Sequence, residues 1–276
     1  MVDFSFIRKD IAKRTVYIDG EVIAMSPLRI GVGRANLDPT STARDTLLKD
    51  PQGRPVIPGS SWKGIFRSTG ERILRDKGLE VCSGIGGDNC LEKRDLSDEF
   101  QKLIKNNVNG ALDMFWKKTC LNCKTFGAMS VIGAVKLADS VASHYTLGVR
   151  TIIAISRTEG AVAEGALASV EFVEPGSKFS FRLIGNNLPN YVIGYLVRIM
   201  EQIHLGLSQV GGQKSRGFGF VQFGKMKFTS VGSEKVGDED KEIKVTVAEG
   251  EGSKFFEQMK PFKEAFDSVK TSYPEK

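Results

Sequence analysis

Histidine is scarce in this sequence, and long apolar runs are absent. Only two histidines occur, His144 and His204, so a histidine acid–base pair has one possible composition, and we expect both residues to be structural. No apolar run approaches the roughly 18 residues of a membrane span. The charged N-terminal stretch, residues 1–14, lacks the apolar core of a secretory signal. We therefore expect a cytoplasmic protein without a membrane partner.

The charge of the chain is unevenly distributed. A composition of 41% hydrophobic and 26% charged residues is typical of a soluble globular protein, and the formal net charge is +6. Residues 231–276 contain 8 lysines and 11 acids, which gives −3 for this segment and +9 for residues 1–230. A basic body with an acidic tail indicates a polyanion as the partner of the body. A solvated surface that only aids solubility explains the same charge equally well.

Hydrophobic periodicity and turn residues divide the chain into strands and helices. The expected elements are a strand in 14–33, a polar loop in 34–56, a helix in 57–78, a cysteine-containing segment in 79–127, strands in 130–143 and 150–185, a helix in 188–207 and a strand in 218–228. This order predicts an α+β fold with a ferredoxin-like (RRM-like) core. We assign residues 1–230 to one RNA-binding domain, with 79–127 as an insertion, and 231–276 to an acidic extension that ends in one amphipathic helix.

Residues 216–223, RGFGFVQF, match the RNP1 consensus of RNA recognition motifs. In such motifs RNP1 lies on the strand before the last helix, and its aromatic rings stack on bases. Here the matching strand follows the helix in 188–207 and is the last strand of the core. We therefore do not expect an RNA recognition motif. A stand-alone RNA recognition protein stays an alternative, and it requires Phe218 and Phe220 to be exposed for stacking.

Two stretches together carry a different resemblance. IPGSSWKGIFRS (57–68) and GGQKSRGFGFV (211–221) resemble the two hallmarks of the RAMP superfamily of CRISPR proteins. Residues 44–64 most closely resemble the backbone subunit of type III effector complexes. This resemblance implies a subunit that polymerises along guide RNA (crRNA). Its implied partners are guide RNA, target RNA, and other effector subunits that include copies of itself or related RAMP subunits.

Both motifs have features that suit a phosphate chain. A Gly-Ser-Ser turn at a helix start presents main-chain N–H groups to an anion, and glycines let a backbone approach closely. The expected RNA-binding residues are Gly59, Ser60, Ser61, Lys63, Arg67, Gly211, Gly212, Lys214, Arg216 and Gly217. Ser60 or Ser61 can cap the helix, and Gly78 can end it. The alternative to RNA binding is structural: Gly59 and Ser60 only cap the helix, and the glycines form a tight turn before a core strand.

Four cysteines lie in the predicted insertion. Cys82 and Cys90 have C-x7-C spacing, and Cys120 and Cys123 have the C-x2-C spacing of zinc ribbons. A small segment with little apolar content needs such a link to hold its shape. We favour structural Zn²⁺ bound by all four, over two disulfides or inert thiols. Four thiolates leave no open coordination position, so no catalytic zinc is expected.

The loop in 34–50 contains the candidate catalytic residues. The resemblance implies that a loop aspartate before the Pro-Gly-Ser-Ser motif cuts target RNA with a divalent metal, Mg²⁺ or Mn²⁺. Asp45 matches that position best and Asp38 is second, while Asp50 fits better as a turn residue. A non-catalytic binding subunit stays an alternative, as does a guide-processing endonuclease that uses His144. Residues 156–165 resemble the tip of a thumb-like hairpin that inserts into the guide–target duplex, and an ordinary hairpin tip is the alternative.

Overall fold

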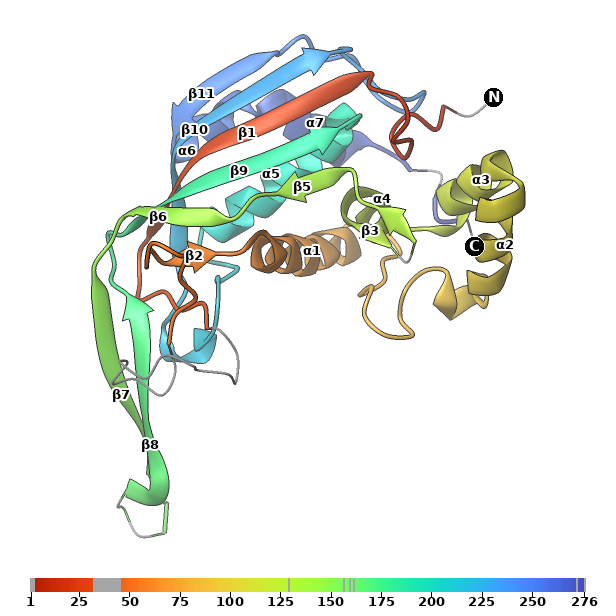
Figure 1. The fold of residues 1–276 in the computed structure, drawn as a ribbon. Coiled ribbons are helices and arrows are strands. Elements are labelled where there is room, and N and C mark those ends of the chain that lie inside the picture. The colour runs from red at the N-terminus through yellow and green to blue at the C-terminus, as the bar shows by residue number, and fades with distance from the viewer. Residues whose placement is uncertain are drawn as a thin grey trace.

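The computed structural model describes residues 3–31, 46–128, 130–155, 157–158, 160, 162–271 and 273–275. Its central sheet is antiparallel. The strands, in spatial order, are β11 (Val247–Glu251), β10 (Val221–Gly232), β1 (Arg14–Ala24), β9 (Lys178–Asn186), β6 (Ser140–His144) and β2 (Val56–Ile57), and β5 (Val135–Leu137) also pairs with β9 (Figure 1).

Two helices make the crossover connections of this sheet. α1 (Gly59–Asp76) lies between β1 and β5 along the chain, and α5 (Asn190–His204) joins β9 to β10. The chain order is thus β1, α1, β5–β6, β9, α5, β10, and β1 lies between β9 and β10 in space. This is the ferredoxin-like βαββαβ arrangement, and it confirms the fold class that the sequence predicts.

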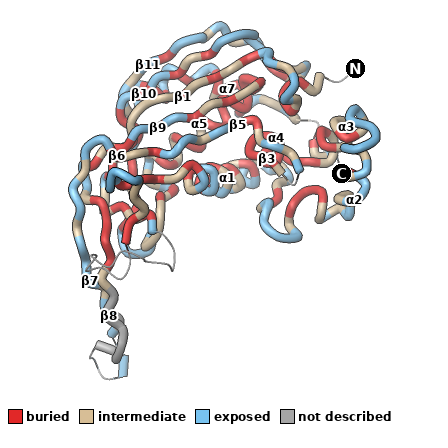
Figure 2. Tube along the Cα trace, viewed as in Figure 1, coloured by how far each residue is buried: buried red, intermediate tan, exposed pale blue. Residues whose placement is uncertain are grey.

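The core lies between the sheet and the helices, and the opposite face of the sheet meets solvent (Figure 2). Val16 and Ile18 of β1 are fully buried, because alternate side chains of a strand point to the same face. Trp62 of α1 and Phe223 of β10 both pack edge-on against Phe181 of β9, with ring centroids 5.3 and 5.2 Å apart. These aromatic contacts fix the position of α1 relative to the middle of the sheet.

The ends of α1 differ in how well the sequence predicts them. Gly78 ends the helix as expected: its φ is +76°, and its N–H donates to Arg75 O. The predicted serine cap is wrong. Pro58 is the N-cap residue, and its side chain makes no hydrogen bond to the first turn. The helix begins at Gly59, before both serines, and the Gly59 N–H donates to Asp139 from another part of the chain.

A two-stranded hairpin projects away from the sheet at one end of the molecule (Figure 1). It consists of β7 (Leu147–Ile155) and β8 (Val162–Val173), with an irregular register between Ile153 and Ile155. Val149, Ile153 and Ile155 are exposed on β7. The predicted thumb-like hairpin is therefore present, although parts of its tip lie outside the described residues.

The cysteine-containing insertion lies at the other end of the molecule (Figure 1). Its elements are a 3-10 turn (Glu92–Arg94), α2 (Ser97–Asn106), α3 (Val108–Lys118), α4 (Leu121–Phe126), β3 (Gly127–Ala128) and β4 (Val131–Ile132). Several buried apolar side chains join it to the main hydrophobic core, among them Phe100 and Phe115, whose ring centroids are 6.0 Å apart. The insertion is therefore held by apolar packing as well as by the part of the chain that contains the cysteines.

The acidic tail continues the sheet and then covers the helices. β11 pairs with β10, and α6 (Ser253–Gln258) and α7 (Lys260–Ser268) follow it. The sequence predicted one helix where the structure has two, because Pro261 begins a new helix at the first turn of α7. The predicted apolar face is nevertheless buried. A Cβ at Gly194 of α5 would lie 1.9 Å from Phe262 O, so glycine allows α7 to pack closely on α5.

α1 is amphipathic, whereas most residues of α5 are buried. Trp62 and Phe66 lie on the buried face of α1, the 18-residue helix, and Lys63 and Arg75 lie on its exposed face. Among the described parts of the chain, no helix combines the length and the apolar character that crossing a membrane requires.

Candidate functional site

The turn that begins α1 is held by the protein itself. The Gly59 N–H donates to Asp139 Oδ1 at 2.8 Å, and the Ser61 N–H donates to Pro58 O at 2.9 Å. A Cβ at Gly59 would lie 2.1 Å from Leu137 O, so glycine allows the turn to pack on the end of β5. The Asp139 carboxylate thus occupies the anion position at the helix N-terminus where the sequence predicts a phosphate.

The side chains of this turn line a cleft. Ser60 and Lys63 are exposed, and Ser61 is half-buried. Ser60 and Lys63 form part of one wall of a cleft of about 840 Å³, and residues 83–86 and 131–133 of the insertion form part of the other. Lys63 therefore places a positive charge in an open cleft between α1 and the insertion.

The glycine-rich loop before β10 is fixed through its backbone. The Gly212 N–H donates to Arg29 O, and the Gly219 N–H donates to Pro27 O, each at 2.9 Å. Gly211 has a φ of +82°, and a Cβ there would lie 2.1 Å from Arg29 O. Two of the predicted RNA-contacting glycines, Gly211 and Gly212, thus hold the loop against the segment that follows β1.

The part of the loop between these anchors is exposed and positively charged. Lys214 and Arg216 lie on a 3-10 turn (Lys214–Arg216) and are exposed, as is Gly217. Gln209 Nε2 donates to Lys214 O at 3.1 Å, and Arg216 Nη1 donates to Gln213 Oε1 at 2.6 Å. The loop therefore presents two exposed cations between Gly212 and Gly219, whose N–H groups anchor its backbone.

The RNP1-like aromatic residues are not arranged for base stacking. Phe218 is 1% exposed and packs edge-on against Phe172 of β8, with centroids 5.6 Å apart. Phe220 is half-buried, and Phe223 lies in the core. A stand-alone RNA recognition protein that uses Phe218 requires this ring to be exposed, so the structure removes that alternative.

The solvent-facing side of the sheet carries ion pairs instead of an aromatic platform. Arg182 Nε lies 2.7 Å from Asp19 Oδ1, and Lys178 Nζ lies 3.7 Å from Glu21 Oε2. Lys227 on β10 pairs with Glu249 on β11. Pairs of opposite charge attract phosphates far less than unpaired cations do.

Arg150 is a cation that the sequence analysis did not single out. It lies exposed on β7, and its guanidinium carbon is 5.4 Å from the Phe172 ring centroid and 5.2 Å from that of Phe218. Contact with two rings holds a guanidinium in a fixed orientation. Arg150 thus lies where the base of the hairpin meets the glycine-rich loop. Its position depends on strand pairing between distant segments, and no local sequence signal indicates it.

The predicted catalytic aspartates Asp38 and Asp45 lie outside the described residues, and Asp50 lies inside them. Asp50 Oδ1 accepts the N–H groups of Gln52 and Arg54 at 3.0 and 2.8 Å, and its carboxylate pairs with Arg54 at 2.7 Å. Slight burial opposes the charge on Asp50, but these Arg54 contacts outweigh it and lower the pKa of the carboxyl. Asp50 therefore shapes a turn, which confirms the structural interpretation of this residue.

Neither histidine lies in a catalytic arrangement within the described residues. His204 Nδ1 accepts the Phe223 N–H at 3.1 Å, and its ring packs against Phe256. Burial lowers the pKa of His204. His144 is exposed at the end of β6, in register with Lys178 of β9.

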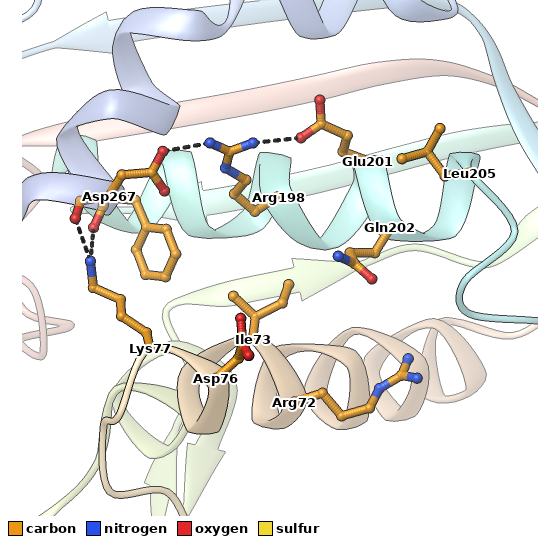
Figure 3. Close-up of a pocket in the computed structure, with 10 residues that line it drawn as sticks. Arg72, Ile73, Asp76, Lys77, Arg198, Glu201, Gln202, Leu205 and Asp267 are labelled. Carbon is orange, nitrogen blue, oxygen red and sulfur yellow. Dashed lines mark hydrogen bonds and ion pairs between the residues drawn. The ribbon is translucent and has the colours of Figure 1, made fainter.

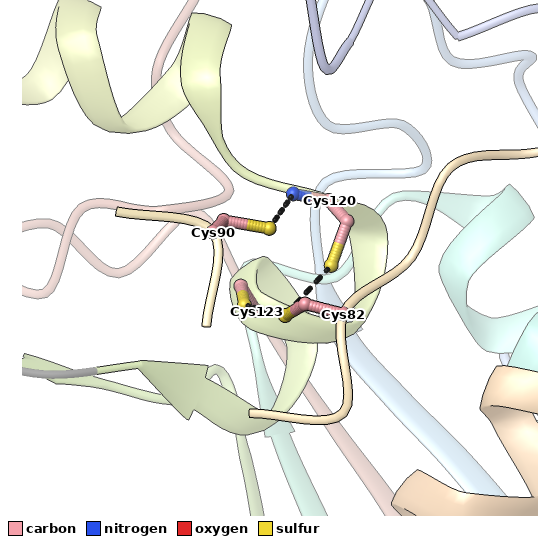
Figure 4. A group of neighbouring side chains, drawn as sticks. All are labelled: Cys82, Cys90, Cys120 and Cys123. Carbon is pink, nitrogen blue, oxygen red and sulfur yellow. Dashed lines mark hydrogen bonds between the residues drawn. The ribbon is translucent and has the colours of Figure 1, made fainter. Parts of the chain in front are cut away.

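The four cysteines form one buried cluster (Figure 4). Their sulfurs all lie within 4.8 Å of one another, and Cys82 Sγ is 3.2 Å from Cys123 Sγ and 3.8 Å from Cys120 Sγ. Tetrahedral zinc with bonds of about 2.3 Å places its sulfur ligands roughly 3.8 Å apart. The donor set therefore fits a tetrahedral metal ion such as structural zinc. Two separate disulfides would not require all four sulfurs to converge.

A comparison with models of protein families identifies the family of this chain. The model of the RAMP superfamily matches residues 21–222, a range that contains both motifs and the cysteine cluster. The chain belongs to the RAMP superfamily. This superfamily includes CRISPR-associated RNA-binding subunits. A search of curated proteins gave no match.

In this RAMP protein, Arg67 faces the cysteine cluster. Its Nη2 lies 3.5 Å from Cys123 Sγ and 3.8 Å from Cys82 Sγ, and its Nη1 donates to Gly127 O at 2.9 Å. Burial disfavours the charged guanidinium, but the neighbouring Cys123 and Cys82 sulfurs outweigh this effect and raise the pKa of Arg67. Lys63 and Arg67, both expected to bind RNA, are one turn apart and line the same cleft, but Lys63 is exposed, whereas Arg67 is half-buried and reaches the cysteines.

A second hollow of the RAMP protein lies between α1, α5 and α7 (Figure 3). Its volume is about 820 Å³, and contacts between its polar groups cross it. Arg198 donates to Glu201 at 3.0 Å and to Asp267 at 2.5 Å, and Lys77 Nζ donates to Phe266 O at 2.8 Å. These contacts join the tail to the two core helices, so this hollow is a structural junction.

Proposed function

We propose that this RAMP protein is a backbone subunit of a type III CRISPR ribonucleoprotein that binds the guide RNA backbone and cleaves complementary target RNA. The observation that carries the proposal is that both motifs inside the family match place exposed cations on rigid backbone. Lys63 lies at the start of α1, and Lys214 and Arg216 lie on the anchored loop before β10.

The two motifs are part of one connected structure. Thr69 Oγ1 of α1 lies 2.8 Å from Ser208 Oγ, and Arg72 Nη1 donates to Leu207 O, just before the glycine-rich loop. A phosphate chain that contacts one motif therefore meets the other at a defined spacing. Contacts made by lysine and arginine to phosphates are independent of base sequence, which suits a subunit that holds guides of any sequence.

Arg150 extends this proposed surface to the base of the β7–β8 hairpin, where its guanidinium is oriented by two phenylalanine rings. Exposed apolar side chains on β7, Ile153 and Ile155, suit insertion of the hairpin between base pairs of a guide–target duplex. Copies of the chain or related RAMP subunits, bound at successive positions along the guide, are the proposed neighbours.

We assign target cleavage to Asp45, with Asp38 as second candidate, from the resemblance alone. In this scheme the carboxylate helps to remove the proton of a ribose 2′-hydroxyl, which attacks the adjacent phosphorus and displaces the 5′ oxygen of the next nucleotide. A bound Mg²⁺ or Mn²⁺ would offset the negative charge that develops on the phosphate.

The experiment compares target-RNA cleavage by the assembled complex carrying Asp45→Ala, Asp38→Ala or no substitution, with Mg²⁺ present and guide binding measured in parallel. Lost cleavage with intact guide binding in Asp45→Ala supports the proposal. Unchanged cleavage in both variants contradicts the catalytic assignment and leaves a non-catalytic RNA-binding subunit. Cleavage of precursor guide RNA without metal, abolished by His144→Ala, would favour the guide-processing alternative.

A further inference from the structure

Arg67 makes more polar contacts with the cysteine-bearing turns than RNA binding explains. Besides the two sulfurs, its Nε donates to Ser83 O at 3.1 Å and its Nη1 donates to Gly127 O at 2.9 Å. Ser83 directly follows Cys82, and Gly127 ends the helix that contains Cys123. One side chain of α1 therefore binds both turns that carry the cysteines.

The insertion is shaped to receive this side chain. Gly84 has a φ of +69°, and a Cβ at that position would lie 2.0 Å from Arg67 Nη2. Glycine is therefore required there both by the backbone conformation and by the guanidinium that passes over it. Asn122 Nδ2 also donates to Arg67 O at 3.1 Å, which ties the same position of α1 to the turn between Cys120 and Cys123.

The charge of the metal site explains why an arginine lies at this position. A divalent zinc ion with four thiolate ligands carries a net negative charge, and all four cysteines are buried. A buried net charge is costly unless an opposite charge and hydrogen bonds compensate it. Arginine suits this task because it stays protonated and offers five N–H donors in a planar fork.

We propose that Arg67 is a positioning residue of the metal site, which compensates the charge of the thiolate ligands and fastens the insertion to α1, and that it takes no direct part in RNA binding. The contacts from Arg67 Nη2 to the Cys82 and Cys123 sulfurs place a positive charge beside two of the four ligands. The carbonyl contacts hold the two ligand-bearing turns at the spacing that one ion requires. Zinc binding thereby orders the wall of the cleft that faces Lys63.

The test uses the full chain with Arg67→Gln, Arg67→Lys or the matched control Arg75→Gln. Arg75 lies about two turns further along the same helix, with a side chain 56% exposed and paired with Glu71. Zinc affinity is measured by competition with a chromophoric chelator, and ligand geometry is read from the thiolate absorption of the cobalt-substituted protein. Loss of contacts of this kind weakens metal affinity by about 10- to 100-fold.

We expect that weakening in Arg67→Gln, an intermediate loss in Arg67→Lys, which keeps the charge but loses the planar fork, and no change in Arg75→Gln. If Arg67→Gln fails to fold, Arg67→Lys decides. Equal zinc affinity in the wild type and the folded Arg67 variants overturns the proposal, as does a wild-type chain that binds no zinc.

An RNA-binding measurement separates this role from the one the sequence suggests for Arg67. With zinc saturating, Arg67→Gln, which removes the charge, should bind single-stranded RNA as tightly as the wild type. A variant that retains zinc fully but loses RNA affinity overturns the proposal and returns Arg67 to the RNA surface.

Discussion

Removing the two cations of the glycine-rich loop tests where this protein holds RNA. The perturbation is the double variant Lys214→Gln/Arg216→Gln. Both side chains are exposed, and the backbone beneath them is anchored by Gly212 and Gly219. We therefore expect the loop to keep its conformation and to lose only its charges.

The magnitude follows from counterion release. Each phosphate contact on single-stranded nucleic acid contributes about 0.7 to the slope of log affinity against log salt concentration. If each cation contacts one phosphate, the double variant lowers the magnitude of the slope by about 1.4. Relative to 1 M salt, that difference weakens binding at 0.1 M salt by roughly 25-fold.

The assay is fluorescence anisotropy with a short single-stranded RNA over a series of KCl concentrations. The matched control is Lys225→Gln/Lys227→Gln, which removes the same charge from the solvent-facing side of β10. An equal loss of slope in the control would show that charge acts without regard to position. A loss confined to the control would refute the reasoning, because RNA would then lie on the open sheet face, as in an RNA recognition motif.

Two further predictions concern stability. In urea denaturation, Gly211→Ala should lower the free energy of unfolding clearly more than Gly217→Ala. Both residues have a φ of +82°, which costs a residue with a side chain about 1–2 kcal/mol, but only at Gly211 would the added Cβ also meet Arg29 O. Equal losses in the two variants would contradict the close-packing argument. Asp240 accepts the N–H groups of Asn190 and Val236, and burial raises its pKa. Between about pH 4 and this raised pKa the folded protein therefore binds one proton more than the unfolded chain, so the stability of the wild type relative to Asp240→Asn should fall as pH rises through that range. A difference that does not depend on pH would contradict this.

The helices and core strands of this fold follow from local sequence patterns. α1 and α5 are predictable because apolar residues recur at helical spacing, and Gly78 ends α1 through a conformation that glycine favours. The start of α1 is less predictable. Its capping acceptor, Asp139, lies 80 residues further along the chain. Local sequence offers two serines as caps, and the tertiary fold uses neither.

The candidate site is predictable where it depends on spacing and unpredictable where it depends on packing. The C-x2-C pair indicates a metal site, and the structure brings Cys82 and Cys90 into the same cluster, as the sequence predicts. Arg67 was assigned to RNA because helical geometry places it one turn from Lys63. Its actual direction depends on where the insertion folds back on α1, and no periodicity of α1 itself reveals that.

The match of residues 216–223 to RNP1 has a physical explanation other than base stacking. Gly219 has a φ of +89°, and a Cβ there would lie 2.2 Å from Val210 O, so the approach to β10 requires glycine. Phe218 fills the space against Phe172, and Phe223 fills the core. Of the consensus positions, Arg216 is the one left with an exposed charge. The same residues therefore suit a loop that leads into an antiparallel strand, with one cation exposed to solvent. Because that cation lies on the loop and the open sheet face carries paired charges, the RNA surface that we propose is the loop, and not the sheet face to which an RNP1 match points.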